Sequence, residues 1–140
     1  MSTMTVSIEH NGKTYTGQPA TIKGTALQFE DHGIFTAWLH LEWKGGGIGV
    51  GGYCLDTPEK DDNGKFARRV GTGYGADHIM RVIETVGASS WEKLPGREVF
   101  VLFEGKSLWG STAAGLAGVT NEKVLILKEH AESWSEKEGR

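Results

Sequence analysis

The segment of this chain best suited to binding an anion is Arg68-Arg-Val-Gly-Thr-Gly-Tyr-Gly75. It comes directly before an expected helix that begins near Ala76, and a helix N-terminus presents unpaired N–H groups with a partial positive charge. Alternating glycines let the backbone approach phosphate oxygens, arginine adds a planar fork, and an aromatic ring can stack on a base or ribose. The segment predicts a phosphate site whose candidate residues are Arg68, Arg69, Gly71, Thr72, Gly73 and Tyr74.

A purely structural interpretation of the same segment stays open. Neither the GxGxxG spacing of dinucleotide-binding turns nor the GK[ST] ending of a P-loop is present. The glycines would then form only a tight turn between a strand and a helix, and the two arginines would be solvated.

The chain offers little for catalysis. Cys54 is close to Asp56 in sequence, and His40 could approach it across a sheet, but a lone cysteine in a strand is more often a small core residue. The carboxylates of Asp61 and Asp62 fall in a polar loop, where no burial would tune a pKa. No pair of histidines has the spacing of a metal site. These patterns predict a binding protein that has no metal and no cofactor.

Two β-hairpins are expected in the first third of the chain. Alternating residues 6–10 and 13–16 flank Asn11-Gly12, which is the strongest short-range hairpin signal. Residues 20–29 and 34–43 form a second pair around turn-forming residues. Trp38 lies on the more polar face of the latter strand, which suits either the rim of a sheet or a contact between subunits.

The glycines of the next segment also allow two interpretations. Every second residue from Gly47 to Gly51 lacks a side chain. Such a strand either crosses tightly under another element or accepts a ligand or a partner backbone against its bare face. Residues 56–65 that follow are expected to be a polar surface loop.

One sizeable helix is predicted from Ala76, with Gly87 as its C-terminal stop. Its apolar side would consist of Ile79, Met80, Ile83 and Val86. Residues 89–92 read as a capping box that opens a short helical turn. Strands are expected at 98–104 and 123–128, and the region 105–118 is too irregular to assign. Residues 129–140 are expected to be a frayed, charged tail or a helical turn.

Length and composition set the limits of this interpretation. A chain of 140 residues with 38% hydrophobic residues predicts one domain, and the net charge of −3 does not favour duplex nucleic acid as a partner. A single cysteine and the lack of long apolar stretches predict a cytoplasmic protein without a membrane segment. We expect a single α+β domain, 1–140, with a largely antiparallel sheet, one main helix, and an N-terminal hairpin extension at 1–19.

The order of several short motifs resembles the phage Thoeris anti-defence proteins over about residues 20 to 105. The motifs are Glu30-Asp-His-Gly-Ile34, Gly51-Gly-Tyr-Cys-Leu-Asp56, Arg69-Val-Gly-Thr-Gly-Tyr-Gly75, Glu84-Thr-Val-Gly87 and Trp91-Glu-Lys-Leu-Pro-Gly96. The resemblance implies a small oligomeric protein, not an enzyme, that sequesters a cyclic ADP-ribose isomer made by a bacterial immune TIR protein. Some members of that family also hold cyclic oligonucleotide signals at a separate site.

The resemblance further implies that Arg69 contacts a ligand phosphate, with Thr72 and Tyr74 beside it. The other ligand contacts of the family come from a later strand and the C-terminal part, where this chain departs from the family pattern. Phe100, Phe103, Asn121 and Lys123 are the candidates there for base stacking and a second positive charge. A homo-oligomer is expected, a dimer or a higher assembly such as a hexamer, in the cytoplasm of the host cell.

The leading hypothesis is therefore sequestration of a cyclic ADP-ribose-type messenger without cleavage. The alternative is inhibition of a host factor by direct protein contact through Trp38, Trp43, Trp109 and Trp134. A third hypothesis is a hydrolase that degrades a cyclic nucleotide with Cys54 and His40.

Overall fold

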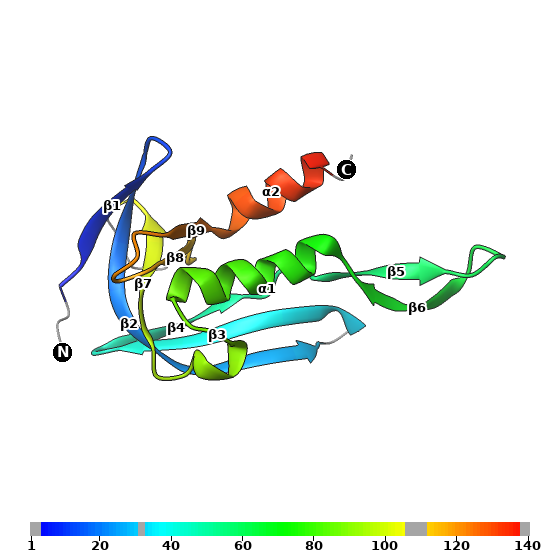
Figure 1. Ribbon diagram of the computed structural model, residues 1–140, viewed down its shortest axis with the longest axis horizontal. Helices are drawn as coiled ribbons and strands as arrows, with labels where there is room; N and C mark the ends of the chain where they lie inside the picture. The colour runs from blue at the N-terminus through cyan, green and yellow to red at the C-terminus, as the bar shows by residue number, and fades with distance from the viewer. Residues whose placement is uncertain (1–3, 31–32, 106–111, 138–140) are drawn as a thin grey trace.

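A computed structural model describes residues 4–30, 33–105 and 112–137 of the chain (Figure 1). It is a single α+β domain with a mostly antiparallel sheet and one main helix, as the sequence predicted. The helical segments are α1 (Gly73–Val86), the short 3-10 helix η2 (Trp91–Lys93) and α2 (Leu127–Lys137). The strands are β1 (Val6–His10), β2 (Lys13–Phe29), β3 (Phe35–Trp43), β4 (Gly46–Gly51), β5 (Asp56–Lys60), β6 (Phe66–Gly71), β7 (Glu98–Glu104), β8 (Gly115–Ala117) and β9 (Val124–Ile126).

Strand β2 organises the main sheet, whose order is β4-β3-β2-β7-β8-β9 with β1 also paired to β2. The first half of this 17-residue strand pairs with β1 on one edge and with β7 on the other. Its second half pairs with β3 from Thr21 onward, with a register shift between Ile22 and Gly24. Both predicted hairpins are confirmed. In the first, Asn11 and Gly12 have the positive φ angles, 51° and 79°, that a two-residue hairpin turn needs.

The core lies between α1 and the sheet, but α1 is turned differently from the prediction. Its buried residues are Tyr74, Gly75, His78, Val82, Thr85 and Val86. Of the four residues predicted to line the apolar side, Val86 belongs to that set, Ile79 and Ile83 are partly buried against the core, and only Met80 is largely exposed. The helix begins at Gly73, before the predicted start, and a methyl group at Gly75 would overlap the Leu55 carbonyl. The first turn of α1 thus lies close against Leu55, and the helix face that carries His78 is buried.

The predicted polar loop at 56–65 is wrong for its first half. Asp56–Lys60 is strand β5, which pairs with β6 in a separate two-stranded sheet. Glu59 lies opposite Arg68 in this pairing, and the two side chains form an ion pair at 3.0 Å. The two strands project beyond the end of the main sheet (Figure 1), and we call them the arm.

The C-terminal segment is also more ordered than predicted. Residues 127–137 form α2, where the end of the strand predicted at 123–128 and a frayed tail from 129 were expected, and the strand itself is the shorter β9. The helix is attached to α1 because Asp77 accepts hydrogen bonds from Trp134 Nε1 at 3.1 Å and pairs with His130 Nε2 at 2.7 Å. Strand β8 lies in the region left unassigned, and the turn at 91–93 forms without the predicted capping box, because its N-cap is Ser90 with no side-chain hydrogen bond.

Tryptophan rings cover the glycines of the β4 region. A methyl group at Gly49 would lie 3.2 Å from the Trp38 ring, and one at Gly52 would be closer still, 2.5 Å from the same ring. Gly46 faces the ring of Trp43 in the same way. The alternating glycines are therefore packed closely by the chain itself: Gly49 by the Trp38 ring, and Gly47 and Gly51 by the backbone carbonyls of Leu41 and Ala37. No helix in the described ranges is long and apolar enough to cross a membrane.

Candidate functional site

Arg69 lies where the arm joins the body and is held by Asp56. Arg69 Nε donates to Asp56 Oδ2 at 2.9 Å, and Nη2 donates to Oδ1 at 2.8 Å. The Asp56 side chain is 3% exposed and that of Arg69 is 22% exposed. The Arg69 hydrogen bonds, with the backbone N–H of Phe35 and the Cys54 thiol, outweigh burial and lower the pKa of Asp56 to about 2. The guanidinium is thus fixed in a side-on pair.

The pairing of β5 with β6 accounts for this geometry. Asp56 stands opposite Gly71, and Arg69 stands opposite Pro58, so the arginine reaches back across the hairpin to the first residue of β5. Its Nη1 group makes no hydrogen bond to any residue in the described ranges. One edge of the guanidinium is therefore available.

A shallow pocket of about 210 Å³ opens beside this guanidinium. The rings of Phe29 and Phe35 lie 5.1 Å apart, centre to centre, and Val70 and Gly71 complete the pocket with the ion pair. Sequence reasoning missed Phe29, Phe35 and Asp56 as site residues. The available signal was an acid placed to face an arginine across a hairpin, which requires that residues 56–60 be recognised as a strand.

Cys54 lies beside the Asp56–Arg69 ion pair and does not form the catalytic pair with His40 that the third hypothesis requires. Its exposed thiol donates to the Asp56 carbonyl at 3.1 Å and receives a hydrogen bond from Arg69 Nη2 at 3.7 Å. His40 lies on β3 opposite Gly24 and Gly49 and is exposed. The described structure shows no contact between the two side chains.

Much of the start of α1 is already occupied by the chain itself. Thr72 Oγ1 accepts the N–H of Gly75 at 2.9 Å and donates to the Leu55 carbonyl at 3.0 Å. Gly73 lies against the Trp134 ring, where an added methyl group would be 3.0 Å away. Tyr74 is buried in contact with the rings of His78 and His130.

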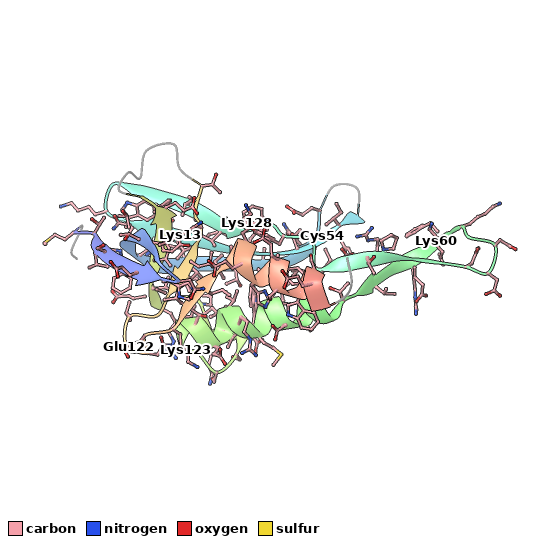
Figure 2. All side chains as sticks on the ribbon, turned by 90° about the horizontal axis from the view of Figure 1, so that it is seen from above. Lys13, Cys54, Lys60, Glu122, Lys123 and Lys128 are labelled. Carbon is pink, nitrogen blue, oxygen red and sulfur yellow. The ribbon has the colours of Figure 1, made fainter. Side chains whose placement is uncertain are left out.

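The remaining predicted site residues do not meet at Arg69. Arg68 points away on the arm, paired with Glu59, and Phe103 is buried in the core while Phe100 packs with a second cluster. Asn121 donates to the Thr85 carbonyl at the C-terminal end of α1, and Lys123 pairs with Glu84 there at 3.7 Å. Figure 2 shows Cys54 near the base of the arm and Lys123 far from it. Of the predicted residues, only Arg69 and Gly71 line the pocket.

Comparisons with protein-family models, curated proteins and solved structures find no match to this chain. The described residues contain no group of three or more His, Cys, Asp or Glu side chains arranged to hold a metal ion.

Proposed function

We propose that this protein binds and sequesters a cyclic ADP-ribose-type signalling molecule, without cleaving it, at the Arg69 pocket. The observation that carries the proposal is the combination of an oriented guanidinium with two phenylalanine rings in one pocket. A phosphate accepts hydrogen bonds from a guanidinium fork, and a base or nicotinamide ring stacks on an aromatic face. Together with the motif resemblance, this pairing supports a nucleotide as the ligand.

The ion pair also indicates that one chain has too little positive charge at this pocket to bind a diphosphate. Asp56 neutralises part of the charge of Arg69, so a diphosphate needs a further cation, and none of the other residues that line the pocket is basic. We propose that a second copy of the chain provides it, with the messenger buried between subunits of a homo-oligomer. Binding without chemistry suits sequestration, because affinity then comes from contacts alone.

The test compares two arginine variants that keep the positive charge. Arg69→Lys retains a cation for Asp56 but loses the fork, whereas Arg97→Lys alters an exposed arginine outside the pocket. In calorimetric titrations with a cyclic ADP-ribose isomer, we expect Arg69→Lys to weaken binding about tenfold or more and Arg97→Lys to leave it unchanged. Equal affinity of Arg69→Lys and the parent protein would refute the Arg69 site.

The fate of the ligand is tested separately. Heating the complex and analysing the released messenger by mass spectrometry should return it intact. A cleaved product would contradict the proposal and favour a hydrolase. In that case, loss of activity in Cys54→Ala would identify the thiol as the nucleophile.

A second candidate function, inhibition of a host protein by direct contact, is favoured by the exposed arm. Phe66 on β6 is 62% exposed, and Phe29 at the end of β2 is 64% exposed. The tryptophans expected as anchors are less suited to contact with a host protein. Trp38 and Trp43 cover glycines, Trp134 packs at the start of α1, and Trp109 lies outside the described residues. A thermal-shift screen separates the functions, since only the first predicts stabilisation by a cyclic nucleotide.

A further inference from the structure

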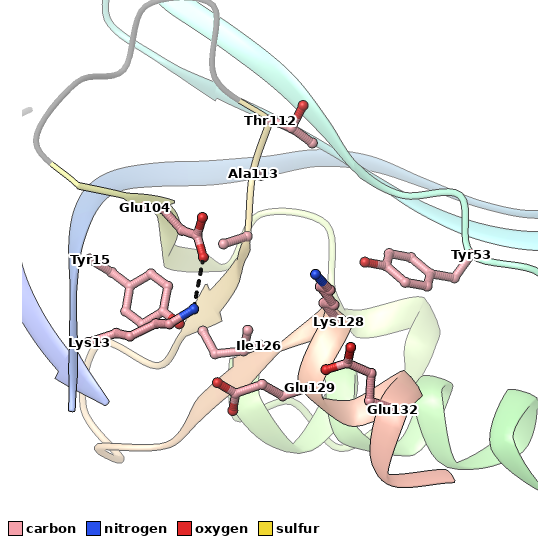
Figure 3. Close-up of a pocket in the computed structure, with 11 residues that line it drawn as sticks. Lys13, Tyr15, Tyr53, Glu104, Thr112, Ala113, Ile126, Lys128, Glu129 and Glu132 are labelled. Atoms are coloured by element: carbon pink, nitrogen blue, oxygen red, sulfur yellow. Dashed lines mark ion pairs between the residues drawn. The ribbon is translucent and has the colours of Figure 1, made fainter. Parts of the chain in front are cut away.

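A second cavity lies away from Arg69, between the first half of β2 and the start of α2. It has a volume of about 520 Å³, within the range of small-molecule sites. Figure 3 shows Lys13 and Tyr15 on one side, Tyr53 on the other, and Lys128 and Glu132 between them. The lining residues are Lys13, Tyr15, Tyr53, Glu104, Thr112, Ala113, Ala114, Ile126, Lys128, Glu129 and Glu132, none of which lines the Arg69 pocket.

The charges of this cavity favour a cation. Lys13 and Glu104 compensate each other in an ion pair at 3.5 Å. That pair leaves one lysine, Lys128, against two glutamates, Glu129 and Glu132. The cavity is therefore net negative, and neither Lys128 nor Glu132 forms an ion pair with another described residue. An anionic ligand such as a nucleotide would meet repulsion there.

The Tyr15 side chain points independently to a ligand. Tyr15 is only 1% exposed, yet it lines the cavity, and its hydroxyl makes no hydrogen bond within the described part of the chain. The hydroxyl oxygen is not one of the fully buried, unpartnered side-chain atoms of the described residues, so it is open to the cavity that Tyr15 lines. Burial, followed by the charge of Glu129, raises the pKa of Tyr15, so the group stays a neutral phenol at physiological pH. A ligand in the cavity would supply the missing partner.

The aromatic rings and carboxylates together define the ligand's chemistry. The Tyr15 and Tyr53 rings offer faces to a cation, and Ile126, Ala113 and Ala114 provide an apolar wall for an alkyl chain. An ammonium group has three donors, which matches two carboxylates and a phenol oxygen. A bare metal ion fits poorly, because the volume is far larger than an ion and the described residues form no metal-binding cluster.

We propose that this cavity binds a small organic cation, an aliphatic amine whose ammonium group is held by Glu129, Glu132 and the Tyr15 hydroxyl. Glu129 retains capacity for this role, since the described hydrogen bond from Asn11 and the contact with His10 use only its Oε1 atom. The site goes beyond the nucleotide function and does not depend on it.

The test uses two probes of equal chain length and opposite charge, 1,5-diaminopentane and glutarate, titrated calorimetrically into the full chain at neutral pH. The diamine should bind saturably and glutarate should not. Glu132→Gln should weaken diamine binding about tenfold or more, because it removes a charge-assisted hydrogen bond. Glu136→Gln, one turn further along α2 and outside the cavity lining, is the matched control and should change the affinity less than about twofold.

Tyr15→Phe tests the hydroxyl while keeping the ring, with a melting curve to establish that the variant is folded. Tyr15→Phe should weaken diamine binding several-fold. If Tyr15→Phe does not fold, the comparison of Glu132→Gln with Glu136→Gln tests the proposal. Lack of saturable diamine binding, preference for glutarate, or equal losses in Glu132→Gln and Glu136→Gln would each overturn the proposal. Arg69→Lys should leave diamine affinity unchanged, so failure of this site and failure of the nucleotide site are distinguishable.

Discussion

The body of this protein and its arm both consist of antiparallel strands, but they are stabilised in different ways. In the body, the sheet packs against α1 around side chains such as Val99 and Leu116, which are fully buried. In the arm, every residue from Thr57 to Arg68 is exposed. An isolated two-stranded sheet is marginal in water, so the arm depends on its base, where Asp56 and Arg69 pair. Burial therefore supports the body, whereas two ion pairs, Asp56–Arg69 and Glu59–Arg68, and the β5–β6 pairing support the arm.

The largest effect is expected from a cavity in the body. Leu116→Ala removes a fully buried side chain from the main core cluster and should lower the free energy of unfolding by about 2–5 kcal/mol. Denaturant titration measures this loss. Leu27→Ala, at a leucine of β2 that is 41% exposed, should cost less than about 1 kcal/mol. Similar losses in the two variants would contradict the assignment of Leu116 to the core.

Acid should lower the free energy of unfolding of the body because of His78. Burial, then the nearby His130, lowers the pKa of His78 to about 4 from 6.5, against the opposing effect of Asp77. Between about pH 6.5 and pH 4, the unfolded chain therefore binds a proton at His78 that the native chain does not bind. The free energy of unfolding falls across this range as the pH is lowered, by up to about 3 kcal/mol.

His78→Leu should flatten that part of the stability curve, measured by denaturant titration at several pH values. Tyr53, Tyr74 and His130 surround His78, so the control is His40→Leu on the exposed face of β3. A pH dependence in His78→Leu equal to that of the parent protein would show that another group is responsible.

A smaller effect is expected where the arm leads into the body. Thr72→Ala removes the side-chain cap of α1 and should cost about 1 kcal/mol. Thr57→Ala, at an exposed position of β5, serves as the control and should be near neutral. Thermal unfolding of both variants measures the difference, and a neutral Thr72→Ala would mean that water replaces the cap without loss.

The smallest effect on stability is expected on the arm. Phe66→Ala should change the free energy of unfolding of a single chain by less than about 0.5 kcal/mol, because the ring is largely exposed. Sedimentation of the same variant tests whether the arm contacts another copy. If the parent protein is an oligomer and Phe66→Ala dissociates it, the arm is an assembly element. An unchanged assembly would place the subunit contact elsewhere.

Local patterns in the sequence were sufficient for much of the body. The Asn11-Gly12 turn, strand β7 and the stop of α1 at Gly87 follow from backbone preferences and alternation that each segment carries by itself. The arm and α2 were missed because their stability is not local. β5 is polar and holds Pro58, and α2 is a charged helix that depends on the contacts of His130 and Trp134 with Asp77.

For the candidate site as well, local sequence patterns identified one residue but not the residues that the fold brings to it. The sequence indicated Arg69 as the charged group, but its partner Asp56 is 13 residues away and meets it only through the hairpin. The aromatic wall of Phe29 and Phe35 comes from the β2–β3 turn, which no motif links to Arg69. Residues 100, 103, 121 and 123 were grouped by resemblance, whereas the fold assigns them to the core, a second packing cluster and the far end of α1.

Strand β2 has a consequence for how this chain could be divided. Because its first half pairs with β1 and β7 and its second half with β3, it belongs to both ends of the sheet. A break anywhere between Lys13 and Phe29 would leave each fragment with an unsatisfied row of backbone amides and carbonyls. The described domain therefore offers no boundary within β2 for splitting it into halves that fold alone, and an insertion is better tolerated at the arm's tip, residues 61–65.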